Sequence, residues 1–302
     1  MASKPFASVI VPTYNRKECL ARCLQGLARQ SFTDFEVIVV DDASTDGTPE
    51  SLGHPNYRVV RLERNRGAPG ARNAGVKAAR GVVVAFIDDD CVPEADWLEK
   101  LLLPYQDQAI SGVGGRVRVL PDNYISFENG CVDRFGTVLT VRPIGRCAPG
   151  FYPYFVTCNA SFRRVALEAI GLFDEDFFYY EEPDVCVRLL RAGHALVFEN
   201  KALVYHHVIP GGKYQQDKFY WMARGRRRFA LKNFSNELSV LGLVFFEAIN
   251  LARNGRRFAS GLIGSRKPIS PARVLSTLKG AVAGYASGLA FLSTHHLPLR
   301  FF

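Results

Sequence analysis

Three consecutive aspartates, Asp88, Asp89 and Asp90, follow an apolar run that starts at Val82. An uninterrupted apolar run predicts a strand that is covered on both faces of a parallel sheet, and such sheets bind ligands at the carboxyl ends of their strands. Carboxylates this close repel one another, and their hard oxygens suit Mg²⁺ or Mn²⁺ that carries substrate phosphates. The sequence therefore predicts a divalent cation site. A solvated acidic turn ahead of a helix near Glu94 is the alternative.

A second acidic group, Glu181, Glu182 and Asp184, stands at the start of a predicted helix that runs from Pro183 to Ala192. Adjacent carboxylates raise each other's pKa, and a carboxylate with a raised pKa suits a general base. Acidic side chains are also favourable at a helix N-terminus, so a purely structural role stays open for Glu181 and Asp184.

Strand and helix patterns alternate through the first 103 residues, and they would position the first acidic group. We predict strands at Ser8–Asn15, Phe35–Val40, Tyr57–Leu62 and Val82–Pro93, a helix at Lys17–Ala28, and another opened by the glycine-rich segment Arg66–Gly75. This order predicts βαβ units and a parallel sheet, and therefore an α/β fold.

Beyond Gly112 the pattern changes, and this half is expected to shape the site of a second substrate. We predict β segments at 115–120 and 151–157, a helix at Ser161–Ile170, and a strand at Ala202–Tyr205 that leads into His206 and His207. Because side chains alternate along a strand, only one of these two histidines can face a site at its end.

The length of 302 residues permits one large α/β domain, or one domain of about 200 to 230 residues with an appendage. Hydrophobic residues at 48% and charged residues at 22% are typical of a globular protein. Seven cysteines without a CxxC pair indicate a reducing compartment, in which all seven would serve as small buried hydrophobes. The first residues lack the apolar core of a signal sequence, so we expect a cytosolic protein.

Charge is distributed unevenly along the chain. Residues 1–218 carry 25 Lys and Arg against 27 Asp and Glu, whereas residues 219–302 carry 13 against 2. From about Tyr214 onward the chain is predicted to be helical, and its apolar runs, Leu238–Leu251 and Ala281–Leu292, fall short of the roughly 20 apolar residues of a membrane span. Arg253, Arg256 and Arg257 follow the first run. We expect peripheral contact with an anionic membrane, or else a helical subdomain packed on the core.

Four motifs, in this order, resemble those of family 2 glycosyltransferases. They are SVIVPTYNR at Ser8–Arg16, VDDASTDGT at Val40–Thr48, FIDDD at Phe86–Asp90, and EEPDVCVRLLRAG at Glu181–Gly193. The resemblance covers roughly residues 7 to 210. It implies a GT-A fold, which is Rossmann-like with a mostly parallel sheet flanked by helices, over residues 1–212. The donor half would be about 1–112 and the acceptor half about 113–212, followed by a basic helical region at 213–302.

The resemblance also implies a binding site for a nucleoside diphosphate sugar. Pro12, Thr13 and Tyr14 would lie near the nucleotide base, and Asp42 matches the aspartate that accepts from the imide N–H of uracil or thymine. Arg72 matches a position near the diphosphate. The family pattern Asp-x-Asp makes Asp88 a contact of the ribose or the metal and Asp90 a ligand of Mg²⁺ or Mn²⁺. Asp89 could take over the ligand role, and His206 or His207 matches a histidine that reaches the metal or the diphosphate.

For the acceptor side, the resemblance implies that Glu182 is the general base, where the family usually has aspartate. Glu181 or Asp184 could share this role, and Asn159 is expected to contact the acceptor. The predicted function is inverting, metal-assisted transfer of a sugar, with a UDP or dTDP donor favoured, to a hydroxyl of a lipid-linked or cell-envelope glycan. The protein would act on the inner face of the cell membrane.

Two other functions compete with this prediction. A sugar-nucleotide nucleotidyltransferase also combines an α/β sheet with acidic metal ligands, but it normally carries a basic, glycine-rich triphosphate loop after its first strand, and Pro12–Arg16 lacks one. A nucleic-acid-binding protein would use the basic tail, but that tail has neither a zinc knuckle nor an RNP-like pattern. We therefore expect no nucleic acid partner.

Overall fold

The computed structural model describes residues 4–48, 57–122, 124–127, 130–140, 147–207, 217–239, 242–243, 245–247, 249 and 271–295. The chain forms two compact units. The first consists of Met1–Cys131, Leu139–Phe177 and Glu181–Pro210, and the second of Val132–Val138, Phe178–Tyr180 and Gly211–Phe302. The boundary predicted near residue 212 lies outside the described residues.

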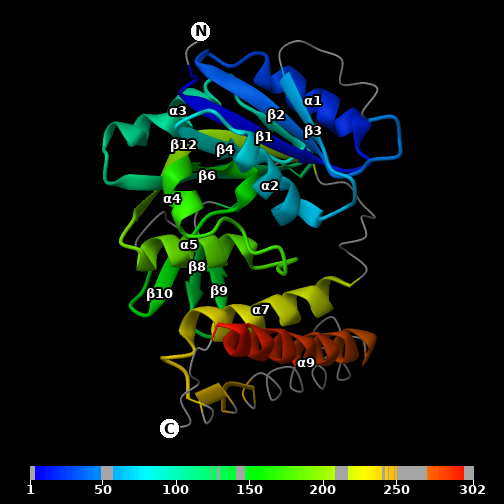
Figure 1. Ribbon diagram of the computed structural model, residues 1–302, viewed down its shortest axis with the longest axis vertical. Coiled ribbons are helices and arrows are strands. Elements are labelled where there is room, and N and C mark those ends of the chain that lie inside the picture. Colours follow the sequence, from blue (N-terminus) through cyan, green and yellow to red (C-terminus); the bar gives the residue numbers. More distant parts are fainter. Residues whose placement is uncertain are drawn as a thin grey trace. The chain divides into compact units, whose positions relative to one another are not determined.

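A nine-stranded sheet forms the core of the first unit, with the strand order β3-β2-β1-β4-β11-β6-β12-β5 and with β7 paired to β6 (Figure 1). The first four strands in this order are mutually parallel, β11 is antiparallel to both of its neighbours, β12 is parallel to β6, and β5 is antiparallel to β12. The strands are β1 (Ala7–Thr13), β2 (Phe35–Asp41), β3 (Tyr57–Arg61), β4 (Val83–Phe86), β5 (Cys91–Pro93), β6 (Ile110–Leu120), β7 (Tyr124–Phe127), β11 (Ala160–Arg163) and β12 (Ala195–His207).

Helices and a smaller sheet complete the described part of the fold around this core. The helices are α1 (Lys17–Leu27), α2 (Gly67–Ala78), α3 (Trp97–Leu102), α4 (Arg164–Ala169) and α5 (Glu181–Arg191), with 3₁₀ turns η2 (Leu103–Gln106) and η3 (Thr157–Asn159). A three-stranded sheet has the order β10 (Phe151–Tyr154), β8 (Gly130–Asp133) and β9 (Val138–Thr140). The predicted α/β fold with a mostly parallel sheet is confirmed.

The register of the sheet explains why the motifs meet. In parallel pairing, Thr13 at the end of β1 lies beside Asp41 at the end of β2, and Ile10 lies beside Phe86 at the end of β4. The segments that follow these three strands therefore leave the sheet at the same edge. The antiparallel pairing of β12 with β5 places His206 opposite Cys91. The C-terminal end of a distant strand thus reaches the aspartate triplet.

Three sequence predictions for secondary structure need correction. Residues 82–93 form two short strands, β4 and β5, with the aspartates between them, rather than one strand. The glycine-rich segment after Arg66 is itself helix α2, because Gly75 lets the helix lie close on β1, where a Cβ would stand 2.4 Å from Cγ2 of Ile10. Ala160–Arg163 is a strand, since it completes the sheet between β4 and β6, and the helix begins only at Arg164.

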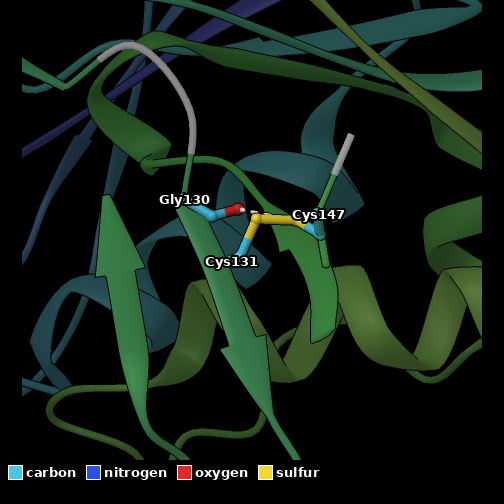
Figure 2. The surroundings of a disulfide bond; sticks show 3 residues. All are labelled: Gly130, Cys131 and Cys147. Atoms are coloured by element: carbon cyan, nitrogen blue, oxygen red, sulfur yellow. Dashed lines mark hydrogen bonds between the residues drawn. A yellow bond between two sulfur atoms is a disulfide. The ribbon is translucent and has the colours of Figure 1, made fainter. Parts of the chain in front are cut away.

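The prediction that all seven cysteines are unpaired is wrong for two of them. Cys131 and Cys147 form a disulfide, shown in Figure 2. The remaining five, Cys19, Cys23, Cys91, Cys158 and Cys186, are free and buried, as expected for small apolar side chains.

Two helices, α7 (Lys218–Phe234) and α9 (Pro271–Thr294), dominate the described residues of the second unit (Figure 1). Glycines spaced four residues apart on α9 allow close contact with α7, since a Cβ at Gly280 would stand 2.1 Å from the carbonyl oxygen of Tyr220 and one at Gly284 2.4 Å from that of Arg224. The basic helical C-terminal region is therefore confirmed. No helix among the described residues is long and apolar enough to cross a bilayer. Arg253, Arg256 and Arg257 lie outside those residues.

Candidate active site

The aspartate triplet lies between β4 and β5, and each carboxylate has different partners. Asp88 is half-buried, and its Oδ1 accepts a hydrogen bond from Nη2 of the buried Arg72 at 2.9 Å. Asp89 is buried, and its Oδ2 accepts from the hydroxyl of Thr13 at 2.8 Å. Burial raises the pKa of Asp89 to about 7. Thr13, predicted near the nucleotide base, therefore holds Asp89.

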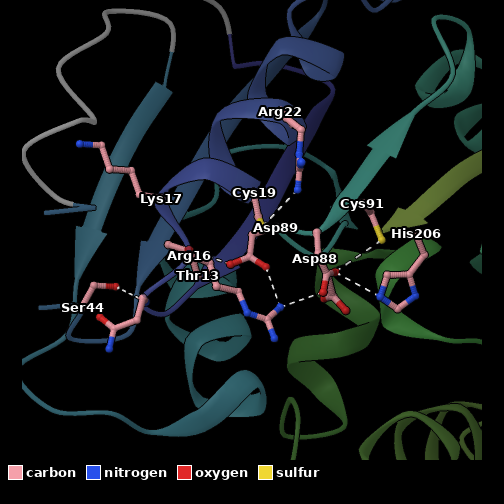
Figure 3. Close-up of polar contacts among 12 residues, drawn as sticks. Thr13, Arg16, Lys17, Cys19, Arg22, Ser44, Asp88, Asp89, Cys91 and His206 are labelled. Carbon is pink, nitrogen blue, oxygen red and sulfur yellow. Dashed lines mark hydrogen bonds and ion pairs between the residues drawn. The ribbon is translucent and has the colours of Figure 1, made fainter. Parts of the chain in front are cut away.

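Arg16 contacts two of the three aspartates, and Figure 3 shows it beside Asp89. Its Nη1 atom is 3.1 Å from Oδ1 of Asp89 and 2.8 Å from Oδ2 of Asp90. Burial lowers the pKa of Arg16, but the negative charges of Asp89 and Asp90 outweigh burial and raise it above its usual value. The first motif contains Arg16, but sequence analysis gave it no role. The sequence feature that could have identified Arg16 is its position three residues after β1, because β1 pairs with β4 and the aspartates follow β4.

Asp90, Cys91 and His206 bring three ligand atoms within 4.8 Å of one another. Nε2 of His206 is 3.3 Å from Oδ1 of Asp90, and this contact raises the pKa of the imidazole. A carboxylate and an imidazole are a donor set that Mn²⁺ accepts, so these residues fit the expected divalent cation. Cys91, a fully buried neighbour, was not predicted.

His207 does not share this position. Its backbone N–H donates to the carbonyl oxygen of Asp90 at 2.8 Å, and its side chain is not part of the ligand cluster found among the described residues. Burial lowers the pKa of its imidazole, whereas that of His206 is raised. As the strand alternation described above predicts, one of the two histidines, His206, lies in the ligand cluster, and a metal contact of His207 stays a prediction.

Glu182 lies in the first turn of α5, beside the 3₁₀ turn at Thr157. The Thr157 backbone N–H and hydroxyl lie 3.4 Å and 3.2 Å from the same Glu182 oxygen, Oε1. Burial, followed by the negative charge of Glu181, raises the pKa of Glu182 to about 8. A carboxylate that is held in place and has a pKa near neutrality is suited to accept a proton from a substrate hydroxyl.

Arg72 connects the two acidic groups. Besides its contact with Asp88, its Nη1 lies 3.4 Å from Oε1 of Glu181, and the arginine side chain is only 4% exposed. The Nε atom of Arg72 and the Oε2 atom of Glu181 are buried and have no hydrogen-bond partner among the residues that the structure describes. Arg72 therefore fixes Glu181 relative to the aspartate triplet, which makes Glu181 part of this bridge rather than a free base.

Two predicted site residues are buried in the fold. Asp184 is fully buried, and its Oδ2 lies 2.8 Å from Nη2 of Arg188, one helical turn along α5. Asn159 is also fully buried. Its Oδ1 accepts from the Trp97 indole at 2.8 Å, and its Nδ2 donates to two backbone carbonyls. Since these side chains are enclosed and already paired, their contacts support the fold, and the base role of Asp184 and the acceptor contact of Asn159 stay predictions.

The residues predicted around the nucleotide base lie at the ends of β1 and β2. Tyr14 is 45% exposed, whereas Pro12 is buried within β1. Both carboxylate oxygens of Asp42 accept backbone N–H groups at the start of α2, from Arg66 at 2.7 Å and from Gly67 at 2.8 Å. Gly67 has a φ of +73°, which favours glycine. Asp42 therefore caps α2, and a base contact would use its remaining lone pairs.

Comparison with known proteins gives relatives over most of the chain. Glycosyltransferase AglE of Haloferax volcanii is 28% identical over 229 residues, which are 71% of each chain. TarS of Staphylococcus aureus, named a poly(ribitol-phosphate) beta-N-acetylglucosaminyltransferase, is 47% identical over 90 residues, 28% of this chain and 16% of that one. The crystal structure of S. aureus TarS matches with a TM-score of 0.51 and 26% identity, over 73% of this chain and 39% of TarS.

A further solved structure shares the fold. It is the mannosyltransferase PcManGT from Pyrobaculum calidifontis in complex with GDP-Man and Mn²⁺, with a TM-score of 0.55 and 19% identity over 95% of this chain and 88% of that one. The family model described as Glycosyl transferase family 2 matches residues 8–171. This match contains the triplet Asp88–Asp90 and Arg16 with it. The chain belongs to glycosyl transferase family 2.

Proposed function

We propose that the enzyme transfers a sugar from a nucleoside diphosphate sugar to an acceptor hydroxyl with inversion at the anomeric carbon. The observation that carries this proposal is Glu182, whose carboxylate is held by Thr157 and has a pKa raised to about 8. Arg72 and Glu181 connect the helix that carries Glu182 to the aspartate triplet. A general base for the acceptor hydroxyl and an acidic cluster for the donor phosphates, present in one site, support direct displacement of the diphosphate by the hydroxyl.

In this reaction Glu182 accepts the proton of the acceptor hydroxyl as its oxygen attacks the anomeric carbon. The new carbon–oxygen bond forms while the bond from that carbon to the donor phosphate oxygen breaks, and the electron pair leaves with the nucleoside diphosphate. Attack from the face opposite to the leaving group inverts the centre in one step. Thr157 keeps the Glu182 carboxylate oriented, and no covalent enzyme intermediate is needed.

Asp90 and His206, with Asp88 beside them, would hold a Mg²⁺ or Mn²⁺ ion. When bound, such an ion neutralises the charge that develops on the departing diphosphate. Mn²⁺ in the structure of PcManGT supports this assignment. The arginine that contacts Asp88, Arg72, is positioned to add positive charge on the phosphate side of the site.

The donor is expected to be a UDP or dTDP sugar, with Tyr14 exposed for stacking on the base and Asp42 at the end of β2. The acceptor is expected to be a lipid-linked or cell-envelope glycan, which the poly(ribitol-phosphate) acceptor in the name of TarS supports. The basic C-terminal helices would make peripheral contact with anionic lipid on the cytoplasmic face, where nucleotide sugars are made.

The test is a nucleoside diphosphate release assay over a panel of sugar nucleotides, with Mg²⁺ or Mn²⁺ and a membrane lipid extract as acceptor source. Glu182→Gln should abolish release, whereas Glu168→Gln, which changes an exposed carboxylate on α4, should leave release unchanged. Metal-dependent release from one donor supports the function and identifies the sugar. Equal loss of release in both variants, or release that survives Glu182→Gln, would overturn the role of Glu182. Failure to bind any donor would overturn the whole proposal.

A further inference from the structure

Two guanidinium groups contact the aspartate triplet, and they differ in how firmly they are held. The side chain of Arg72 is 4% exposed and is fixed from both sides by Asp88 and Glu181. The side chain of Arg16 is 32% exposed and contacts only Asp89 and Asp90 among the described residues. Arg16 can therefore leave its position without breaking other contacts of its side chain, and Arg72 cannot.

The backbone around Arg16 does not depend on this contact. Arg16 is the residue before helix α1, and its side chain makes no capping hydrogen bond there. Asn15 beside it has a φ of +52°, and this turn is secured by hydrogen bonds between Asn15 and the Ser44–Thr45 segment instead. The hydrogen bonds of Asn15 thus hold the loop, and the polar contacts of the Arg16 guanidinium among the described residues are those with Asp89 and Asp90.

Arg16 occupies oxygens that a divalent cation would need. Its Nη1 lies 2.8 Å from Oδ2 of Asp90, while the other oxygen of Asp90 faces His206 at 3.3 Å. On Asp89, Arg16 and Thr13 occupy one oxygen each. A second positive charge within a few ångströms of a divalent cation repels it and so weakens its binding.

We propose that Arg16, which contacts both members of the Asp89–Asp90 pair, competes with the divalent cation for Asp90. It neutralises the pair when no metal is bound, it lowers the metal affinity of the site, and it moves into solvent when the metal binds. This inference rests on the metal-assisted function proposed above. It explains how three consecutive carboxylates, one of them buried, are tolerated in a folded chain without an ion.

The first experiment titrates the full chain with Mn²⁺ and follows free Mn²⁺ by electron paramagnetic resonance. Arg16→Gln should lower the dissociation constant for Mn²⁺ at least about tenfold, because the competing charge is gone. Arg16→Lys should give an intermediate value, since the positive charge is kept but the Nη1 atom that contacts both carboxylates is lost. The matched control is Arg22→Gln. It removes the same charge from α1, where the arginine is exposed and contacts Sγ of Cys19 rather than a carboxylate. Its dissociation constant should stay within about twofold of wild type.

The second experiment uses the wild-type protein, so it does not depend on a variant that folds. Phenylglyoxal modification, resolved by mass spectrometry, should become faster at Arg16 when Mn²⁺ is added and stay unchanged at Arg22. An Arg16→Gln variant that binds Mn²⁺ no better than wild type, or Arg16 modification that Mn²⁺ does not accelerate, would overturn the inference while the proposed function stands. Absence of Mn²⁺ binding to every form would remove the metal from the proposed function and the inference with it.

Discussion

Thr157 directs both its backbone N–H and its hydroxyl at one oxygen of Glu182, at 3.4 Å and 3.2 Å. The other oxygen, Oε2, is thereby left as the one that can face a substrate hydroxyl. Since Thr157 belongs to a 3₁₀ turn and Glu182 to α5, the pair joins two elements that are 25 residues apart. The orientation of the base therefore depends on a residue that carries no charge.

Replacing Thr157 by valine should lower kcat about tenfold, because the carboxylate loses the hydroxyl that orients it while the side-chain shape is kept. Loss of that donor should also shift the pH profile to higher pH, since the hydroxyl stabilises the ionised carboxylate. Steady-state kinetics between pH 6 and 9 measure both effects. Thr157→Ser, which retains the hydroxyl, is the control and should stay close to wild type. An unchanged profile in the valine variant would argue against this role.

The pH dependence of activity should reflect Glu182. Its pKa is raised to about 8 by burial and by Glu181, so the base is largely protonated at neutral pH. We expect kcat/KM to rise about tenfold per pH unit below this value and to level off above it. Glu182→Asp, which restores the usual family residue, should keep part of the activity and Glu182→Gln none. A flat profile from pH 6 to 9 would contradict the assignment.

The same raised pKa affects stability with a definite sign. Folding favours the protonated form of Glu182, so the stability that this group contributes is fully present below the usual glutamate pKa and is lost as pH rises towards 8. Glu182→Gln, which is neutral at every pH, should therefore stabilise the fold relative to wild type at pH 8 and much less at pH 5. Urea unfolding at the two pH values measures this difference, and equal effects at both would contradict it.

Substitution of Asp184 should lower the stability of the fold, whereas substitution of Glu182 should lower activity. Asp184→Asn leaves Arg188 without its partner inside α5, and breaking a buried ion pair costs about 3 to 5 kcal/mol. The activity per folded molecule should stay near wild type because the Asp184 carboxylate is buried and paired with Arg188. Urea unfolding and activity at a permissive temperature provide the two measurements. If folded Asp184→Asn protein lost as much kcat as Glu182→Gln, this would support the predicted catalytic role of Asp184.

Asn159→Ala should also act on the fold. The change removes the acceptor of the Trp97 indole N–H and the donor to the carbonyl oxygens of Arg116 and Ala202 in a buried site, at about 1 to 3 kcal/mol for each group left unsatisfied. The melting temperature should fall clearly, while the KM for the acceptor stays unchanged. An increase in acceptor KM without loss of stability would support the contact that the resemblance implied.

The parts of this structure that the sequence predicts well are those that depend on local pattern. The apolar runs of β1, β2 and β4 end in Thr13, Asp41 and Phe86, and parallel pairing then requires the residues after them to meet. The segment Ala160–Arg163 was predicted wrongly because its local pattern favours a helix, whereas pairing with β4 and β6 imposes a strand.

The contacts that local pattern cannot reveal are those between distant side chains. The position of Arg16 just after β1 places it near the triplet, but only the structure shows that its guanidinium reaches Asp89 and Asp90, which are more than 70 residues away. Likewise, the small polar residue Asn159 looks like a substrate contact until its three buried partners are known. The neighbours of a polar side chain in the fold, not its residue type, decide whether it can bind a substrate or only stabilises the fold.

The pairing of β12 with β5 has a consequence for how the protein is made. His206 takes its place opposite Cys91 only through this pairing, so the carboxylates and the imidazole come from segments more than a hundred residues apart. A nascent chain still attached to the ribosome already carries the three aspartates once residue 90 has emerged, but it lacks the imidazole until residue 206 follows. The complete set of carboxylate and imidazole ligands therefore cannot capture an ion in the early stages of synthesis, and for most of that time Arg16 and Arg72 are the cations available to the triplet.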